Sequence, residues 1–503
     1  MTNKLSQSLL KASFPNSGKI TSESTRLPRI IQFGTGMLLR ALPDFLIQEA
    51  IDQGRLNGSV VIVKSTGADV SEFSNQDNLY TVLIKGLRNG QQVQEHKIIS
   101  CVSSVVSAVD NWSVVLQYAA QPAVDILISN STEAGFIYKP EIFDEQAAPS
   151  TFPAKLTRYL YERFRLLGEM DAPGLIILPT ELISENGLVL RSFVERHAEH
   201  NLLPELFINW LRIKNYFCNT LVDRIVPGKC EPNDVIQING VSYTDKLHTA
   251  AEPYALWAIE GDEAIKEKLS FFSEGSAAFV TNNLEPYKER KLRILNGSNT
   301  FMAGLGWQMD CTTTYDTMML DQTRIYTRQL IFEEIIPTIE KRCADLETFA
   351  NETLDRFSNP EIRYPLQTIA RGYSGKMNNR NVETFFRYYE IKGQLPVLSC
   401  LGLASFFVYY IPAGCDNGVY YMMRDGVKYN YHDDKAELLC SLLSGVSSNP
   451  EMLKEKIQEI LKNNSIFSRD LTTLPGLLDV VARFASQILE TGMPRVLRGV
   501  LSK

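Results

Sequence analysis

A short apolar run that ends in two glycines is the feature that most limits how this chain can fold. Residues 30–33 read Ile-Ile-Gln-Phe and predict a short buried strand, and Gly34 and Gly36 follow at once. Such glycines allow a tight turn with the backbone close to a ligand, and residues 37–50 predict a helix that starts there. The N-terminus of a helix binds anions such as a pyrophosphate. The usual dinucleotide motif, G-x-G-x-x-G, has a third small residue, and Leu39 stands at that position here. A dinucleotide site and an ordinary tight turn are therefore both compatible with this segment.

The alternation of strand and helix continues through the first half of the chain. Apolar runs of strand length alternate with longer amphipathic runs, which is typical of an α/β fold with a doubly wound sheet. Lys64 ends the second predicted strand, where an NAD site usually has an acidic residue, so the choice between NAD and NADP stays open. Asn89-Gly90 predicts a hairpin turn. The predicted strands are residues 59–64, 80–84, 97–106, 124–129 and 174–179, and the predicted helices are residues 111–120, 153–167 and 188–200.

The second half of the chain has a different pattern. Beyond residue 245 the strand-like runs become rare, and long amphipathic segments such as residues 322–344 dominate. We therefore expect residues 1–244 to form an α/β domain and residues 245–503 to form a mostly α-helical domain. Asp425-Gly426 predicts a small hairpin near the end of the chain.

Charge and cysteine placement argue against several classes of partner. The net charge is −7 and no basic block occurs, which argues against nucleic acid and an anionic membrane surface. No run of about 18 apolar residues occurs, so we expect no membrane span. The eight cysteines form no C-x-x-C pair and no zinc-binding spacing with histidine. We therefore expect free thiols, no metal site and, since the N-terminus lacks a signal peptide pattern, a cytoplasmic protein. The oligomeric state stays open.

The segment Lys-Leu-Arg-Ile-Leu-Asn-Gly-Ser-Asn is the candidate for chemistry. Its polar members are Lys291, Asn296 and Asn299, with apolar residues between them. At 100° per residue on an α-helix, Asn296 lies about 140° from Lys291 and Asn299 about 80° from it, so all three could point into one cleft. The alternative is an amphipathic helix with a surface lysine.

A polar turn follows the strand predicted at residues 124–129. Ser129, Asn130, Thr132 and Glu133 stand at the carboxyl end of this strand, which is where a doubly wound sheet binds its ligand. The same residue types also form ordinary turns.

Several segments in the expected order resemble the long-chain polyol and mannitol dehydrogenase family, and in particular its hexuronate branch. The resemblance covers about residues 29 to 490. It is carried by residues 30–36, 39–41, 76–77, 79–81, 129–135, 217–225, 227, 252–254, 256–257, 291–296 and 356–363.

The resemblance implies an expanded Rossmann domain that binds NAD, followed by a helical substrate domain, with no catalytic metal. It implies that Lys291 is the general acid that protonates the ketone oxygen, and that Asn296 donates a hydrogen bond to the developing alkoxide. The activity implied is reduction of a keto-uronate, with tagaturonate to altronate first. The cofactor positions implied are Ile31, Gln32, Phe33, Gly34, Thr35, Gly36, Met37, Leu38, Arg40, Ser129, Asn130, Thr132 and Glu133.

This sequence departs from the family at positions near the expected substrate. The family motif Lys-x4-Asn-x2-His ends here in Asn299, and two further histidines of the hexuronate branch are replaced by Ala255 and Tyr364. Arg363 and Lys376 are candidates for the substrate carboxylate, because cationic donors suit a uronate; ordinary surface charges are the alternative. Fructuronate reduction, polyol oxidation and a non-catalytic dinucleotide-binding paralogue are the other readings.

Overall fold

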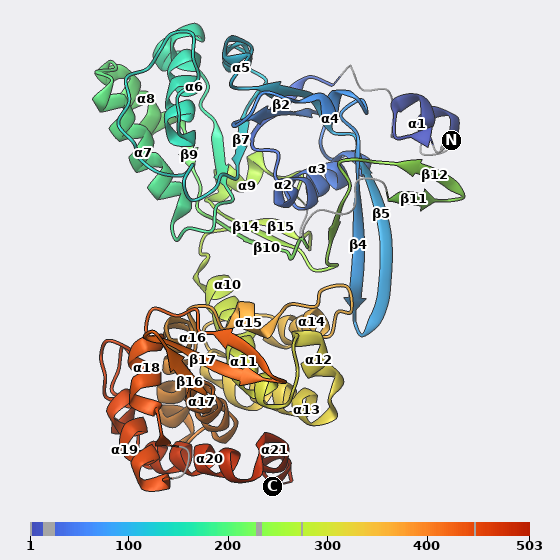
Figure 1. Ribbon diagram of the computed structural model, residues 1–503. Coiled ribbons are helices and arrows are strands. Elements are labelled where there is room, and N and C mark those ends of the chain that lie inside the picture. The colour runs from blue at the N-terminus through green and yellow to red at the C-terminus, as the bar shows by residue number, and fades with distance from the viewer. Residues whose placement is uncertain (1–2, 14–25, 228–233, 273–274, 447–448, 503) are drawn as a thin grey trace. The chain divides into compact units, whose positions relative to one another are not determined.

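The computed structural model describes residues 3–13, 26–227, 234–272, 275–446 and 449–502. The chain divides into two compact units (Figure 1). The first unit comprises Met1–Lys85 and Gln92–Leu284, and the second comprises Gly86–Gln91 and Glu285–Lys503. Each unit has its own hydrophobic core and is described separately.

A six-stranded parallel sheet forms the centre of the first unit, in the strand order β6-β3-β2-β7-β8-β9. β2 pairs with β3 on one side and with β7 on the other, so the strand order reverses at the end of β2. In such sheets this reversal point is where a ligand binds. The strands are β2 (Pro28–Phe33), β3 (Ser59–Lys64), β6 (Val102–Ser107), β7 (Ile126–Ser129), β8 (Ile176–Pro179) and β9 (Tyr216–Phe217).

The sheet is buried on both faces, which explains why its strands are almost continuously apolar. Successive side chains point to opposite faces, so Ile30 and Ile126 lie in one core while Ile31 and Leu127 lie in the other. The first core includes α2 (Met37–Ala41) and α3 (Pro43–Asp52). The second core includes α5 (Trp112–Ala119), α6 (Phe152–Leu166), α7 (Asn186–His200) and α8 (Glu205–Lys214), as Figure 1 shows.

The helix predicted at residues 37–50 is interrupted. Leu42 leaves the helical conformation, with φ −125° and ψ −75°, and separates α2 from α3. The reason is Pro43, whose ring disfavours a helical conformation in the residue before it. The short α2 therefore belongs to the glycine turn, and α3 packs separately against the sheet.

The two predicted hairpin turns are confirmed. Asn89 and Gly90 have φ of 54° and 73° and join β4 (Tyr80–Arg88) to β5 (Gln91–Ile99). Asp425 and Gly426 have φ of 51° and 76° and join β17 (Val419–Arg424) to β18 (Val427–Asn430). Positive φ at both central residues gives the turn the twist that a hairpin needs.

The first unit extends beyond the boundary expected at residues 244/245 and ends at Leu284. β14 (Leu256–Glu260) pairs antiparallel with β10 (Thr220–Asp223), and β15 (Ala278–Thr281) pairs parallel with β14. Trp257 on β14 is fully buried in the first core. Residues 245–284 therefore lie in the first unit because their strands complete its packing.

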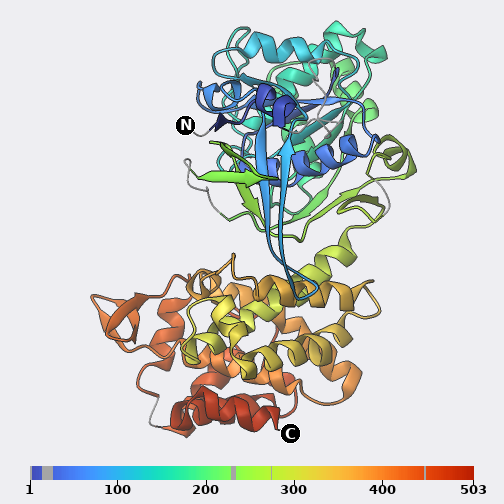
Figure 2. The same ribbon diagram turned by 90° about the vertical axis from the view of Figure 1, so that its right-hand side faces the viewer.

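The second unit is mostly helical, as expected (Figure 2). Its core helix is α17 (Val397–Tyr409), which packs against α11 and α20. None of the helices in the described residues is long and apolar enough to cross a membrane. The main helices are α10 (Glu285–Arg290), η2 (Lys291–Gly297), α11 (Ser298–Gln308), α12 (Thr314–Met319), α13 (Asp321–Gln329), η3 (Leu330–Ile335), α14 (Leu346–Phe357), α15 (Leu366–Ile369), α16 (Tyr373–Lys392), α17, α18 (Ala436–Leu443), α19 (Pro450–Leu461), α20 (Leu477–Thr491) and α21 (Met493–Leu501).

Candidate active site

The two glycines of the turn after β2 have different structural roles. Gly34 has φ +128°, and a Cβ there would lie 2.7 Å from the Leu39 side chain and 2.8 Å from the Asn130 carbonyl oxygen. Only glycine fits that position. Gly36 has φ −63°, and a Cβ there would meet no atom within 4 Å. Gly34 is therefore required by the fold, whereas Gly36 faces open space that a ligand can enter.

The other residues of the turn fit a dinucleotide through the backbone. Ile31 and Phe33 are buried in the second core, so only their main-chain groups are available at the sheet edge. Thr35, Met37 and Leu38 are partly exposed beside Gly36. The first N–H groups of a helix have no acceptor within the helix, and the start of α2 therefore suits a pyrophosphate.

A buried polar network lies beneath the turn. The Asp44 carboxylate accepts hydrogen bonds from Tyr80 Oη at 2.6 Å and from Gln32 Nε2 at 3.3 Å. Arg40 is buried, donates to the Leu247 carbonyl oxygen and lies over the Tyr80 ring. Gln32 and Arg40 were expected to bind the cofactor; the structure places their side chains in this network, where they support the turn from below.

Because Asp44 in this network is buried, we expect the stability of the protein to depend on pH. Burial raises the pKa of Asp44 to about 6 from 3.8. The folded protein therefore binds this proton more tightly than the unfolded chain, so its stabilising contribution is present below pH 4 and is lost as the pH rises through 6. The unfolding free energy of the wild type, relative to Asp44→Asn, should fall by roughly 2 kcal/mol between pH 4 and 7 in urea titrations. If the unfolding free energies of the two proteins changed in parallel with pH, this result would contradict the prediction that the buried Asp44 carboxyl titrates in this range.

The turn after β7 lies next to the glycine turn. The Asn130 backbone N–H donates to the Phe33 carbonyl oxygen at 3.2 Å, and the Asn130 side chain donates to the Thr180 carbonyl oxygen at 3.0 Å. Ser129 Oγ donates to Glu181 at 3.1 Å within the protein interior. Thr132 and Glu133 are exposed. The structure thus brings Asn130 and the exposed pair to the reversal point of the sheet, while Ser129 faces inward.

Lys64 at the end of β3 contacts the loop that follows it. Its amine donates to the carbonyl oxygen of Asp69 in the loop that follows. The lysine therefore stabilises its own loop.

The segment Lys291–Gly297 is a π-helix, η2, inserted between α10 and α11. In a π-helix the hydrogen bond joins residues five apart, so such residues stand one turn above each other. The α-helical estimate of about 140° between Lys291 and Asn296 is therefore wrong, because the two residues lie one π-turn apart on one side. Asn299 follows Asn296 by three residues as the helix returns to α geometry, so it continues the same face. All three are partly exposed.

Contacts from α16 hold this wide turn open. Arg380 Nη1 donates to the Asn296 carbonyl oxygen at 3.3 Å, and Asn381 Nδ2 donates to the Gly297 carbonyl oxygen at 3.3 Å. A Cβ at Gly297 would lie 2.8 Å from Asn381 Oδ1, so glycine lets the two helices approach. Thr300 Oγ1 also donates to the Asn296 carbonyl oxygen, at 2.7 Å. These donors satisfy carbonyl groups at the point where π geometry ends.

The residues expected at the substrate carboxylate have separate contacts. Arg363 is exposed and its guanidinium lies over the Tyr315 ring, 5.1 Å from the centroid. Tyr364 is 43% exposed, so it is available to a ligand. Lys376 Nζ donates to the Ile369 carbonyl oxygen at 2.8 Å and thereby caps the end of α15. Arg363 and Lys376 are thus not presented together as a pair.

Three residues of the site were not predicted. Glu181, Asp44 and Arg380 all act through contacts between segments far apart in the chain. Glu181 accepts from Ser129 Oγ and from the Ser131 backbone and so fixes the turn after β7. The only sequence signal was for Glu181, which stands two residues after the end of a buried strand.

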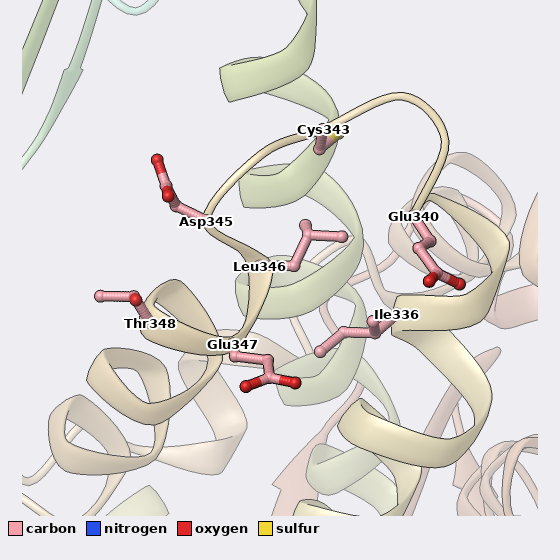
Figure 3. Close-up of a pocket in the computed structure, with 7 residues that line it drawn as sticks. All are labelled: Ile336, Glu340, Cys343, Asp345, Leu346, Glu347 and Thr348. Carbon is pink, nitrogen blue, oxygen red and sulfur yellow. The ribbon is translucent and has the colours of Figure 1, made fainter.

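The pocket in Figure 3 does not fit this chemistry. It has a volume of about 320 Å³ and lies in the second unit. Its lining contains Glu340, Asp345 and Glu347 and no cationic side chain, so it would repel an anionic substrate. The described residues contain no group of three or more histidine, cysteine or acidic residues placed to hold a metal ion.

Sequence comparison assigns both units to one family. The profile described as the mannitol dehydrogenase Rossmann domain matches residues 28–271, and the mannitol dehydrogenase C-terminal domain matches residues 283–489. The altronate oxidoreductase of Halalkalibacterium halodurans is 35% identical, over 96% of this chain and 95% of that protein. The altronate oxidoreductase of Bacillus subtilis is 32% identical, over 93% of this chain and 94% of that protein.

Solved structures share the fold. Mannitol 2-dehydrogenase of Pseudomonas fluorescens, solved with NAD and D-mannitol, is 20% identical with a TM-score of 0.61, covering 99% of this chain and 100% of that one. A D-sorbitol dehydrogenase in substrate-free form is 21% identical with a TM-score of 0.72, covering 94% and 95%. Because the profiles span most of the sequence and the sequence relatives exceed 30% identity over nearly its whole length, the chain belongs to the mannitol dehydrogenase family of oxidoreductases.

Proposed function

We propose that this protein is an NAD-dependent oxidoreductase that reduces a keto-uronate, tagaturonate, to the corresponding hydroxy acid, altronate. The observation that carries the proposal is the π-helix, which puts Lys291 and Asn296 one turn apart on a shared face. The altronate oxidoreductases at 32–35% identity support the choice of substrate.

The residues of the glycine turn suit NAD. Gly34, Thr35 and Gly36 let the backbone approach the pyrophosphate, and the N-terminus of α2 complements its charge. Asn130, Thr132 and Glu133 lie at the neighbouring strand end. Lys64 is engaged with the Asp69 carbonyl oxygen, which favours NAD over a cofactor with a 2′-phosphate. NADH, when bound, supplies the hydride for the ketone carbon.

Lys291 and Asn296 divide the remaining chemistry between them. The Lys291 ammonium donates a proton to the ketone oxygen during reduction, and the amine takes this proton back in the reverse direction. The Asn296 amide donates a hydrogen bond to the same oxygen as negative charge develops on it. The lysine and asparagine together polarise the carbonyl.

Asn299 has a defined orientation in this scheme. Its side-chain oxygen accepts from Arg380 Nη1 at 3.3 Å, so its amide N–H groups are left to face the substrate. An amide does not titrate near neutral pH, and this position therefore contributes a hydrogen bond without moving a proton.

NADH oxidation with a panel of sugars tests the proposed function. Tagaturonate, fructuronate, fructose and tagatose are each offered to the protein with NADH, and the decay of NADH absorbance is followed. We expect the highest kcat/KM with tagaturonate. A higher value with fructuronate or with a neutral ketose would overturn the substrate assignment. NADH binding without turnover of any substrate would identify a non-catalytic paralogue.

Restoring the family histidine in Asn299→His should change the pH dependence. The Arg380 cation lies against this position and opposes a second positive charge, so the pKa of the new imidazole should lie below the ordinary 6.5. The kcat/KM profile for tagaturonate between pH 5 and 9 should gain one ionisation on its acid side. Asn299→Gln, which keeps an amide, is the control. Identical profiles for all three proteins would mean that this position does not contact the reacting groups.

A further inference from the structure

Arg380 on α16 points its guanidinium at the C-terminal end of the π-helix. Nη1 donates to the Asn296 carbonyl oxygen, to Asn299 Oδ1 at 3.3 Å and to Thr300 Oγ1 at 3.0 Å. All three acceptors bond the same nitrogen. The guanidinium is therefore held rigidly beside the two asparagines by a single nitrogen.

The opposite edge of the same guanidinium has no partner in the described residues. No acceptor there bonds Nε or Nη2, and no carboxylate pairs with Arg380. The ionisable groups that interact electrostatically with it are Tyr364 and Lys376. Burial lowers the pKa of Arg380 to about 10, since a desolvated cation without a counter-ion is unfavourable.

Other arginines of the same region have acidic partners. Arg387 on α16 pairs with Glu289, and Arg293 of the π-helix pairs with the same carboxylate at 3.2 Å. Arg469 pairs with Glu383 at 3.1 Å. Arg380 thus differs from Arg387, Arg293 and Arg469 in lacking a carboxylate partner within the described residues, although it is half-buried.

The free edge of Arg380 matches the shape of a carboxylate. Nε and Nη2 of a guanidinium point in parallel and donate two hydrogen bonds to the two oxygens of one carboxylate. Lys376, one turn earlier on α16, has its amine occupied by the end of α15. Arg363 is exposed and lies over Tyr315. Of these three cations, only Arg380 contacts Asn296 and Asn299 and also has donor groups without a partner in the described residues.

We propose that Arg380 binds the carboxylate of the substrate through Nε and Nη2 while Nη1 keeps Asn299 in place. The proposal rests on the proposed function and deepens it: Arg380 is the residue that selects a uronate over a neutral ketose. Tyr364, which is exposed and close to the same guanidinium, would border the bound carboxylate.

The test compares one substrate pair in wild type and Arg380→Gln. Tagaturonate and tagatose share a carbon chain, but tagatose has a hydroxymethyl group in place of the carboxylate. We expect kcat/KM for tagaturonate to fall by roughly 100-fold or more, because charged bidentate hydrogen bonds are lost. The value for tagatose should fall at least about tenfold less than that for tagaturonate, since tagatose loses only the support that Nη1 gives to Asn296 and Asn299 and no carboxylate contact. Arg380→Lys should recover part of the loss, because lysine keeps the positive charge but lacks the two parallel donors of a guanidinium.

Two further measurements keep the outcomes distinct. Calorimetric titration of altronate and of altritol, in the presence of NADH, reports carboxylate recognition without turnover. Arg469→Gln removes an arginine that already has an acidic partner, and should leave both substrates unaffected.

Equal losses for tagaturonate and tagatose in Arg380→Gln would make Arg380 a purely structural support of the π-helix and would overturn the proposal. An unchanged affinity for altronate would overturn it as well. Wild-type protein that neither turns over tagaturonate nor binds altronate would instead overturn the proposed function, because that result does not involve the variant.

Discussion

Lys291→Ala is expected to lower kcat by about 1,000-fold or more while leaving NADH affinity within about twofold of wild type. The lysine stands at the start of the π-helix, one turn from Asn296, and belongs to the second unit. Its loss removes the proposed proton donor for the ketone oxygen but no group of the glycine turn. Single-turnover absorbance measurements with saturating NADH and tagaturonate give the chemical step, and fluorescence titration gives the NADH affinity.

A lysine of the same helical run supplies the matched control. Lys288 lies three residues earlier on α10 and pairs with Glu285 at 2.8 Å. Exposed pairs of this kind contribute about 0–1 kcal/mol, so Lys288→Ala should keep nearly full activity. Normal chemistry combined with weakened NADH binding in Lys291→Ala would place the lysine at the cofactor and refute its role as the acid.

Alanine at the two glycines of the cofactor turn should produce opposite defects. Gly34→Ala introduces a Cβ that clashes with Leu39 and with the Asn130 carbonyl oxygen, in a backbone conformation with φ +128°. We expect the unfolding free energy to fall by roughly 2–4 kcal/mol. Gly36→Ala meets no protein atom and keeps φ −63°, so stability should change by less than about 0.5 kcal/mol.

Cofactor affinity separates the two roles further. The open space at Gly36 is where the proposed pyrophosphate approaches the backbone, so Gly36→Ala should weaken NADH binding by about tenfold or more. Urea unfolding and NADH fluorescence titration on the same preparations report both quantities, and each variant serves as the control for the other. Wild-type NADH affinity in a stable Gly36→Ala protein would show that the cofactor does not approach this turn.

Several local elements of the fold follow from neighbouring residues in the sequence. The alternation of Ile30 with Ile31 and of Ile126 with Leu127 reports a sheet buried on both faces, because successive side chains point to opposite sides. The hairpin turns at Asn89-Gly90 and Asp425-Gly426 follow from residues that tolerate positive φ. Such signals need no knowledge of distant parts of the chain.

The domain boundary could not be predicted in the same way. The strands β14 and β15 lie after residue 245 and pair with β10 and with each other. Their short runs gain stability from this pairing and from burial of Trp257 in the first core. Pairing partners are set by packing in three dimensions, so the sequence placed the boundary too early.

For the candidate catalytic segment, the sequence by itself determined the residue types and the order of Lys291, Asn296 and Asn299, together with their likeness to one enzyme family. Only the tertiary structure decided that they share a face. The end of the π-helix accepts hydrogen bonds from Arg380 and Asn381, which donate to carbonyl groups 84 residues earlier in the chain. A period of 3.6 residues is the local default for an apolar helical pattern, whereas a wide turn needs outside donors for the carbonyl groups that it leaves unpaired.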